Sequence, residues 1–362
     1  MKKWKNNLLF HTIFFPLLFL LFFPRGIHQE IKSLSISNDV IIPDKNEEVT
    51  FSFITTKSLA VDILVVDSEH CVVRRISKNE RLKKGKHEIK WDGKDEAGNI
   101  LPDGVYFFVI MKSGGKIIFN PLKDSGGIKG EVRDLKVDRG KKILEFNLNQ
   151  KSRVQVKVQI VQGPVLKILS DWEPLPAGWN QIKWDGFDED KIVDITKFNN
   201  YKFSVQYLTL PDSAVILRSN VKKQANFKEV LNLNPVQDDK SSVLFSQLHY
   251  LPLSQCKSYP VTLVFPEKSE EEIPTFSDNI KINVDIPNKN YPISIVEIYF
   301  YLDLVILTEK ENIWGLPYEC TLVIPETIKD GEHIFTVNVD SINQQVGIKS
   351  KKIIIRRNKE CN

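Results

Sequence analysis

Four acidic residues lie close together in one loop of the sequence and have the chemistry to bind a cation. Asp92, Asp95, Glu96 and Asp103 occur there among glycines and an asparagine. Calcium prefers oxygen ligands from a glycine-bearing loop, so Asp92, Asp95 and Asp103 are candidate calcium ligands. Asp-Gly and Gly-Asn pairs also form ordinary turns with positive φ, and this second interpretation needs no metal.

A second acidic stretch helps to weigh these two interpretations. It keeps Asp185, Asp188 and Glu189 but has no counterpart of Asp103. Turn geometry is therefore favoured over a metal site, and no cofactor is predicted.

The tryptophans indicate either a protein core or a binding surface. Trp91 and Trp184 each end an alternating strand. A sandwich of this size usually buries a large aromatic between its sheets, so both are predicted to be structural core residues. Trp172, Trp179 and Trp314 lie nearer to turns, where exposed rings would suit sugar or protein binding.

The sequence contains no motif of a known catalytic centre. Its six histidines are dispersed, and it lacks HExxH, GxSxG and a glycine-rich phosphate loop. The protein is therefore predicted not to be an enzyme, and no catalytic residue is assigned.

The four cysteines, Cys71, Cys256, Cys320 and Cys361, are too few and too scattered for a disulfide scaffold. Cys256 and Cys361 flank the last predicted domain, so a disulfide between them would join its two ends. Other pairings and free thiols are the alternatives.

The N-terminus has the features of an export signal. Lysines precede an apolar run from Leu8 to Phe23, and Pro24 terminates it. Residues 1–27 are predicted to be a signal peptide or, because no clear cleavage site follows, an N-terminal anchor. We therefore expect an exported protein in the periplasm, at the cell surface or outside the cell.

The formal net charge of +4 comes from the same segment. Lys2, Lys3, Lys5 and Arg25 precede any acidic residue, so the rest of the chain is neutral. A neutral chain does not attract nucleic acid by bulk electrostatics, and membrane contact is expected only through the N-terminal segment.

The acidic stretches and two of the tryptophans belong to an internal repeat with an offset of 93 residues. Leu82–Glu96 (LKKGKHEIKWDGKDE) aligns with Leu175–Glu189 (LPAGWNQIKWDGFDE). Alternating strands precede each block, and an aromatic-rich strand containing Tyr106 or Tyr201 follows it, so these tyrosines are predicted structural residues. Short, evenly spaced strands separated by Gly, Asp, Asn and Pro are typical of a sandwich.

The strand pattern predicts an all-β fold of tandem Ig-like or fibronectin-like β-sandwiches after the N-terminal segment. The predicted sandwiches are residues 30–121, 128–222 and 276–358. Residues 223–275, rich in proline and acidic side chains, are predicted to be a connector that carries one or two strands.

The block from Trp91 to Tyr106 (WDGKDEAGNILPDGVY) closely resembles the Ig-like domain of the flagellar hook-assembly scaffold protein, FlgD. The resemblance covers residues 30–120 well. It is weaker over residues 128–220, where the Trp-Asp-Gly segment and the Tyr201 strand are kept. The resemblance implies two tandem copies of this domain.

The third unit is similar to bacterial Ig-like modules, through Val296–Tyr299, Trp314 and Asp330–His333. Such families imply a structural, display or adhesion role. We expect a non-catalytic scaffold or adhesion-type protein that presents its sandwiches to another envelope or secreted protein. The alternative is a carbohydrate-binding accessory protein that stacks a glycan on Trp172 or Trp179.

Overall fold

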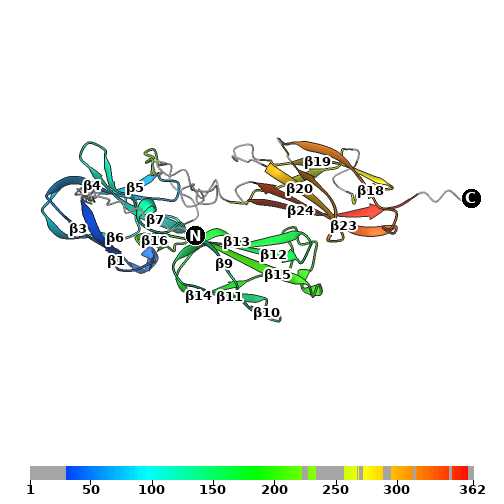
Figure 1. Cartoon of the computed structure of the whole chain (residues 1–362), viewed down its shortest axis with the longest axis horizontal. Coiled ribbons are helices and arrows are strands. Elements are labelled where there is room, and N and C mark those ends of the chain that lie inside the picture. Colours follow the sequence, from blue (N-terminus) through cyan, green and yellow to red (C-terminus); the bar gives the residue numbers. More distant parts are fainter. Residues whose placement is uncertain are drawn as a thin grey trace, which may run out of the picture.

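The computed structural model describes residues 30–221, 227–233, 257–266, 268, 272–287, 295–311, 313, 315–341 and 345–357. Within these ranges the chain is all-β apart from the short helix α1 (Pro121–Asp124) and two 3₁₀ turns, η1 (Pro43–Lys45) and η2 (Ile195–Lys197). Three sandwiches follow one another, so the predicted fold class is confirmed (Figure 1).

The predicted signal or anchor, residues 1–27, lies outside the described residues. Among the residues that are described, no helix has the length and apolar character needed to cross a membrane.

The first sandwich packs a three-stranded sheet against a six-stranded one. The smaller sheet has the order β1 (Ile31–Ile36), β3 (Val49–Thr55), β6 (Gly85–Trp91). The larger has the order β2 (Val40–Ile41), β16 (Ala214–Leu217), β7 (Gly104–Lys112), β4 (Leu59–Val66), β5 (Val72–Leu82), and β8 (Ile117–Phe119) pairs with β7.

Strand alternation explains the core of this sandwich. Phe51 and Phe53 of β3 point inward, and the ring of Phe51 stacks on Phe108 of β7 with 4.5 Å between centroids. The outer face of the larger sheet is also covered, by Leu122, Leu210 and Leu233 among others. Because both of their faces are buried, β4 and β7 consist of nearly continuous apolar runs rather than alternating ones.

The second sandwich has a three-stranded and a four-stranded sheet. Their orders are β10 (Lys136–Asp138), β11 (Ile143–Leu148), β14 (Gly178–Lys183), and β13 (Val165–Leu175), β12 (Ser152–Ile160), β15 (Tyr201–Thr209), β9 (Lys129–Val132).

One strand of the predicted second range belongs elsewhere. Residues 128–222 include β16, but this strand pairs with β7 and β2 of the first sandwich. All four of its residues are buried, so it needs cover on both faces, which the larger sheet of the first sandwich provides.

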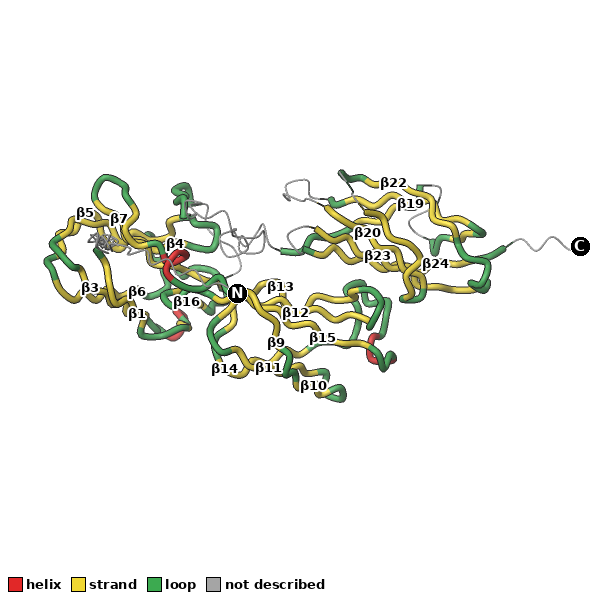
Figure 2. Tube along the Cα trace, in the orientation of Figure 1, coloured by secondary structure: helices red, strands yellow, loops and turns green. Residues whose placement is uncertain are grey.

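The third sandwich also packs two sheets. Their orders are β17 (Thr262–Val264), β19 (Asn279–Asp285), β22 (Tyr318–Val323), and β18 (Thr275–Phe276), β24 (Val346–Ile355), β23 (Gly331–Ser341), β20 (Ile295–Leu302), β21 (Val305–Glu311). Figure 2 shows its strands running beside those of the second sandwich.

The structure also differs from the prediction that residues 223–275 form a connector. Tyr259, Val261, Leu263 and Phe265 are buried in the core of the third sandwich, so this sandwich begins well before residue 276. Prolines at the ends of these short apolar runs made the region resemble a linker, whereas edge strands tolerate proline.

Candidate functional site

The first acidic loop folds around the buried carboxylate of Asp95. Its Oδ1 accepts the main-chain N–H groups of Ala97 and Asn99 at 2.9 and 2.8 Å, and its Oδ2 accepts the side-chain amide of Asn99 at 3.1 Å. Burial alone would raise the pKa of Asp95, but these hydrogen bonds and the charge of Arg74 outweigh it and lower the pKa. Asp95 is therefore a turn-forming residue whose carboxylate already has partners.

The other two predicted calcium ligands have separate partners. Asp92 is exposed and accepts the N–H of Lys94 at 3.2 Å, while Asp103 forms an ion pair with Arg218 at 2.7 Å. Within the described ranges, no three acidic, histidine or cysteine side chains gather into a group that would hold a metal ion. The loop geometry thus provides the turn without bringing the three carboxylates together.

The second acidic loop repeats this arrangement around Asp188, which is fully buried. Its Oδ1 accepts the N–H groups of Ile192 and Val193 at 2.6 and 2.9 Å. Burial raises the pKa of Asp188, and these hydrogen bonds offset the effect only in part. Each loop also has a cation beside it. Arg74 donates to the main-chain carbonyl of Asp95, and Lys167, 93 residues later, donates to the main-chain carbonyl of Asp188 at 3.4 Å.

The tip of the second loop contacts the third sandwich. Oδ1 of Asp190 accepts a hydrogen bond from Nζ of Lys349 at 2.5 Å, and Oδ2 accepts one from the N–H of Ser350 at 2.6 Å. Both partners lie in β24, so one side chain binds a charge and a main-chain group of the neighbouring domain. We call the contacts between the second and third sandwiches the second junction.

An apolar side chain anchors the second junction. Leu304 sits in the turn between β20 and β21, where it and Asp303 have positive φ, and it is buried in a cluster with Ile160 and Trp184 of the second sandwich. A Cβ at Gly163 would lie 2.8 Å from the carbonyl oxygen of Leu304. A glycine is therefore required at this position for the two backbones to approach.

Polar groups buried between the two sandwiches complete the second junction. The side-chain amide of Asn338 accepts a hydrogen bond from the N–H of Val165 at 2.8 Å and donates one to the carbonyl of Val165 at 2.9 Å. It thus pairs with the main chain of Val165 as a residue of a neighbouring strand would. Burial raises the pKa of Asp340 to about 6, although the charge of Lys157 from the second sandwich opposes this. Removing the Asn338 amide would leave the N–H and the carbonyl of Val165 without these partners, so this pairing favours one arrangement of the two domains.

A buried lysine connects the first and second sandwiches at what we call the first junction. The Nζ of Lys151 donates to Oδ1 of Asp39 and to the carbonyls of Asp212 and Ala214, each at 2.7 Å. Burial lowers the pKa of Lys151, and Asp39 partly offsets this. Three donors thus meet three acceptors, which satisfies the ammonium group away from water.

The two repeated tryptophans lie inside their sandwiches. Trp91 is 3% exposed and packs against Tyr106, whose hydroxyl donates to the carbonyl of Pro102 at 2.9 Å. Trp184 is 7% exposed and packs against Tyr201 with 5.9 Å between ring centroids. Each pair fills the end of its core beside the acidic loop.

The remaining tryptophans differ from one another. Trp172, one of the two rings considered for glycan stacking, is 1% exposed, and its Nε1 has no hydrogen-bond partner in the described part of the chain. It has φ of 60° at an irregularity of β13, where the regular alternation of the strand is interrupted. Trp179 is 59% exposed, with the Nζ of Lys136 4.1 Å from its ring centroid, and Trp314 lies outside the described residues.

The cysteines in the described ranges are Cys71 and Cys320, and both are free thiols. Burial raises the pKa of each, which disfavours the reactive thiolate. The predicted disulfide partners, Cys256 and Cys361, lie outside the described residues.

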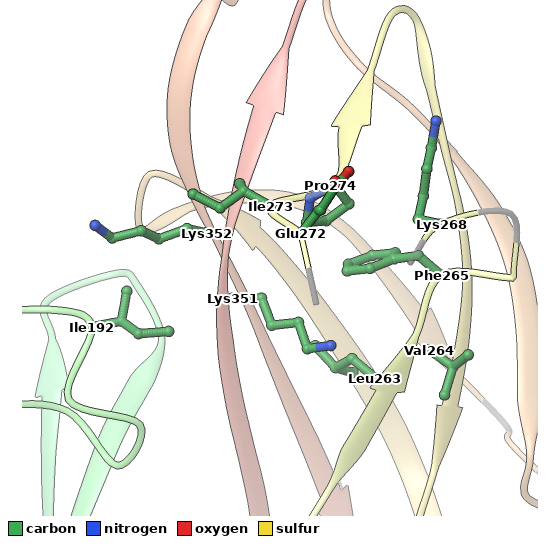
Figure 3. Close-up of a pocket in the computed structure, with 10 residues that line it drawn as sticks. All are labelled: Ile192, Leu263, Val264, Phe265, Lys268, Glu272, Ile273, Pro274, Lys351 and Lys352. Atoms are coloured by element: carbon green, nitrogen blue, oxygen red, sulfur yellow. The ribbon is translucent and has the colours of Figure 1, made fainter. Parts of the chain in front are cut away.

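A small cavity of about 280 Å³ opens on the third sandwich beside the second (Figure 3). The Nζ of Lys351 lies 5.5 Å from the ring centroid of Phe265, and Ile192 of the second sandwich closes one side. Its lining combines aliphatic side chains with lysines and one carboxylate, Glu272, and contains no nucleophile paired with a base.

Comparisons with known proteins identify one domain. Residues 37–116 match the FlgD Ig-like domain family. This is the first sandwich, so one of the two predicted copies is found and the second copy stays a prediction. No curated protein matches the chain.

The chain is similar to several solved structures. Fibronectin(III)-like modules of CbhA from Clostridium thermocellum are 17% identical over 27% of this chain and 97% of theirs, with a TM-score of 0.20. FLGD from P. aeruginosa is 26% identical over 32% of this chain and 84% of its own, with a TM-score of 0.20. A bacterial ice-binding adhesin is 8% identical over 90% of this chain and 98% of its own, also with a TM-score of 0.20.

The junction residues were missed by the sequence analysis. Lys151, Asp190 and Asn338 are single polar residues in strands or turns, and nothing in the local pattern distinguishes them from solvent-facing positions. One signal was available, because Asp190 replaces the small Ala97 at the equivalent position of the repeat.

Proposed function

We propose that this protein is a non-catalytic, exported scaffold or adhesion-type protein that holds three sandwiches in a fixed arrangement and presents them to a protein partner at the cell envelope. The observation that carries the proposal is the second junction. An inserted leucine, a bidentate asparagine and a double hydrogen bond to Asp190 join two domains that a flexible linker alone would leave free.

Three further observations support this role. The N-terminal segment has the features of an export signal. Residues 37–116 of the first sandwich match the FlgD Ig-like domain family. Strand β21 is an edge of the five-stranded sheet in the third sandwich, and its residues Val305 and Ile306 are 66% and 49% exposed. An edge strand with unpaired main-chain groups and exposed apolar side chains can accept a strand of another protein.

The fixed arrangement is tested by small-angle X-ray scattering on the double variant Asp190→Ala, Asn338→Ala. We expect the mature wild-type chain to scatter as one rigid shape and the variant to show a broader range of dimensions. Glu189→Ala is the matched control, because it removes a neighbouring exposed charge whose side chain makes no hydrogen bond in the described ranges. Identical profiles for wild type and double variant would show that these contacts do not fix the domains.

Partner binding is tested by cross-linking the protein in the envelope fraction of its native cells. We expect one discrete cross-linked protein with the wild type and its loss in the variant Val305→Lys, Ile306→Lys. Val323→Lys is the control, since Val323 is 71% exposed but lies on β22 of the other sheet. Capture that survives the β21 variant, or no envelope localisation, would contradict the proposal.

A further inference from the structure

The outer face of the small sheet in the second sandwich carries a tryptophan that its own core does not use. Trp179 in β14 lies opposite Asn147 in β11, and both side chains are exposed. The next pair on this face is Gln181 and Glu145, whose side chains form a hydrogen bond of 3.0 Å. Lys136 from β10 lies over the ring of Trp179, so the indole is held on a flat polar surface.

A groove with a volume of about 730 Å³ runs beside this tryptophan. It lies between β9, the turn from β11 to β12, and the start of β14, and Tyr207 contributes a second ring to it. Ligand sites in proteins commonly occupy about 300 to 1,000 Å³, so the groove has the size of a binding site.

The groove is lined by the apolar side chains of Ile128, Val132 and Leu148 and by polar side chains with unused hydrogen-bonding capacity. The polar side chains comprise three amides and three charged groups, namely Asn147, Asn149, Gln150, Glu131, Arg133 and Asp134. In the described part of the chain none of these six side chains makes a hydrogen bond or an ion pair, and all six are exposed. Amides offer both donors and acceptors, which matches the hydroxyl groups of a sugar.

The charge balance separates the classes of ligand. Glu131 and Asp134 offset Arg133 and Lys136, so the surface has no excess positive charge to bind a polyanion such as nucleic acid. A protein interface would instead be depleted of charged residues at its centre, whereas Glu131, Arg133 and Asp134 line this groove. An exposed indole among amides and balanced charges fits a ligand that is itself neutral, hydroxyl-rich and flat on one face.

We propose that Trp179 and this groove bind a neutral oligosaccharide. The indole stacks on the C–H face of one pyranose ring, and Asn147, Asn149 and Gln150 hydrogen-bond hydroxyls of the adjoining units. This site goes beyond the proposed scaffold function and does not depend on it, because it lies on the second sandwich, away from the strand β21.

The test is isothermal titration calorimetry of the mature chain with cellohexaose, chitohexaose, mannohexaose and laminarihexaose. We expect at least one of them to bind, the binding to weaken on the order of tenfold in Trp179→Ala, and Asn147→Ala to weaken it by a few-fold. All four sugars consist of pyranose rings, so comparing their affinities shows which type of polysaccharide the groove binds.

Val323→Ala serves as the matched control, because it removes an exposed apolar side chain on the third sandwich and should leave the affinity unchanged. Since Trp179 is exposed, its replacement should keep the melting temperature of the protein, which circular dichroism checks. The absence of binding to all four sugars, or binding that Trp179→Ala leaves intact, would overturn the proposal. Either result would leave the cross-linking test of the scaffold function unaffected.

Discussion

The two acidic loops of the repeat share a backbone but differ in what they contact. In the first loop Asp95 N–H donates to the carbonyl of Asn99 at 2.9 Å, and in the second Asp188 N–H donates to that of Val193 at 3.0 Å. A residue of positive φ follows at the tip of each, Gly98 at 84° and Lys191 at 60°. The second loop is longer by one residue, yet its turn closes in the same way.

The difference lies in the side chains at the tip. The first loop has Ala97, whose N–H donates to Asp95 of the same loop, whereas the second has Asp190, which binds two groups of β24. A repeat can therefore keep its turn and its buried aspartate while one exchanged side chain converts the loop into part of a domain junction.

The electrostatics of the buried aspartates follow this difference. Asp95 has the charge of Arg74 nearby and a lowered pKa. Asp188 is more deeply buried beneath the third sandwich, with the like charge of Asp190 beside it, and its pKa is raised. The pKa of the same position is thus shifted in opposite directions in the two copies.

The largest expected effect is one that the two copies share. Trp91→Ala and Trp184→Ala should each destabilise their own sandwich by about 3 to 5 kcal/mol, because each removes a buried indole and leaves a cavity. Hydrogen–deuterium exchange of peptides from each sandwich measures the local free energy of unfolding. Trp179→Ala is the exposed control and should change it little; neutral effects at both buried sites would contradict the core assignment.

A smaller effect should have opposite pH dependence in the two loops. Because the folded pKa of Asp95 is lowered, its contribution to stability is present above the unfolded pKa and is lost as the pH falls through the folded value. Because the folded pKa of Asp188 is raised, its contribution is present at acidic pH and is lost as the pH rises from the unfolded to the folded value.

The isosteric variants Asp95→Asn and Asp188→Asn test this contrast. Each should cost about 1 to 2 kcal/mol through weakened hydrogen bonds to the loop. The cost of Asp95→Asn should grow from acidic to neutral pH, and the cost of Asp188→Asn should shrink over the same interval. The measurement is urea unfolding followed by hydrogen–deuterium exchange at several pH values. If the destabilisation caused by the two variants changed with pH in the same direction, the two sites would be electrostatically alike.

Features that repeat along the chain or follow strand alternation could be predicted from the sequence. The 93-residue offset located both loops and both core tryptophans, because local turns and strand alternation are set by neighbouring residues. The burial of Trp172 could not be read from alternation, because the backbone of β13 is irregular at this residue. The junctions were not predictable, since Asp190 and Lys349 are 159 residues apart and only the packing of two domains brings them together.

The smallest expected effect concerns the tips of the loops. Gly98 has φ of 84°, and no neighbouring atom lies within 4 Å of the place that an alanine methyl group would take. Gly98→Ala should therefore destabilise the first sandwich by about 1 kcal/mol through backbone strain alone. Lys191 adopts the equivalent left-handed conformation with a side chain, so Lys191→Gly should relieve strain and stabilise the second sandwich by up to about 1 kcal/mol.

Lys183→Gly is the control for this pair, because Lys183 is exposed in β14 and lacks positive φ. Glycine in a strand interior should destabilise by about 0.5 to 1 kcal/mol, opposite in sign to the change at Lys191. Exchange rates of the loop amides distinguish the outcomes. Destabilisation by Lys191→Gly would mean that the lysine side chain contributes more at the tip than its backbone strain costs, and the two loops would then differ in their turns as well as in their contacts.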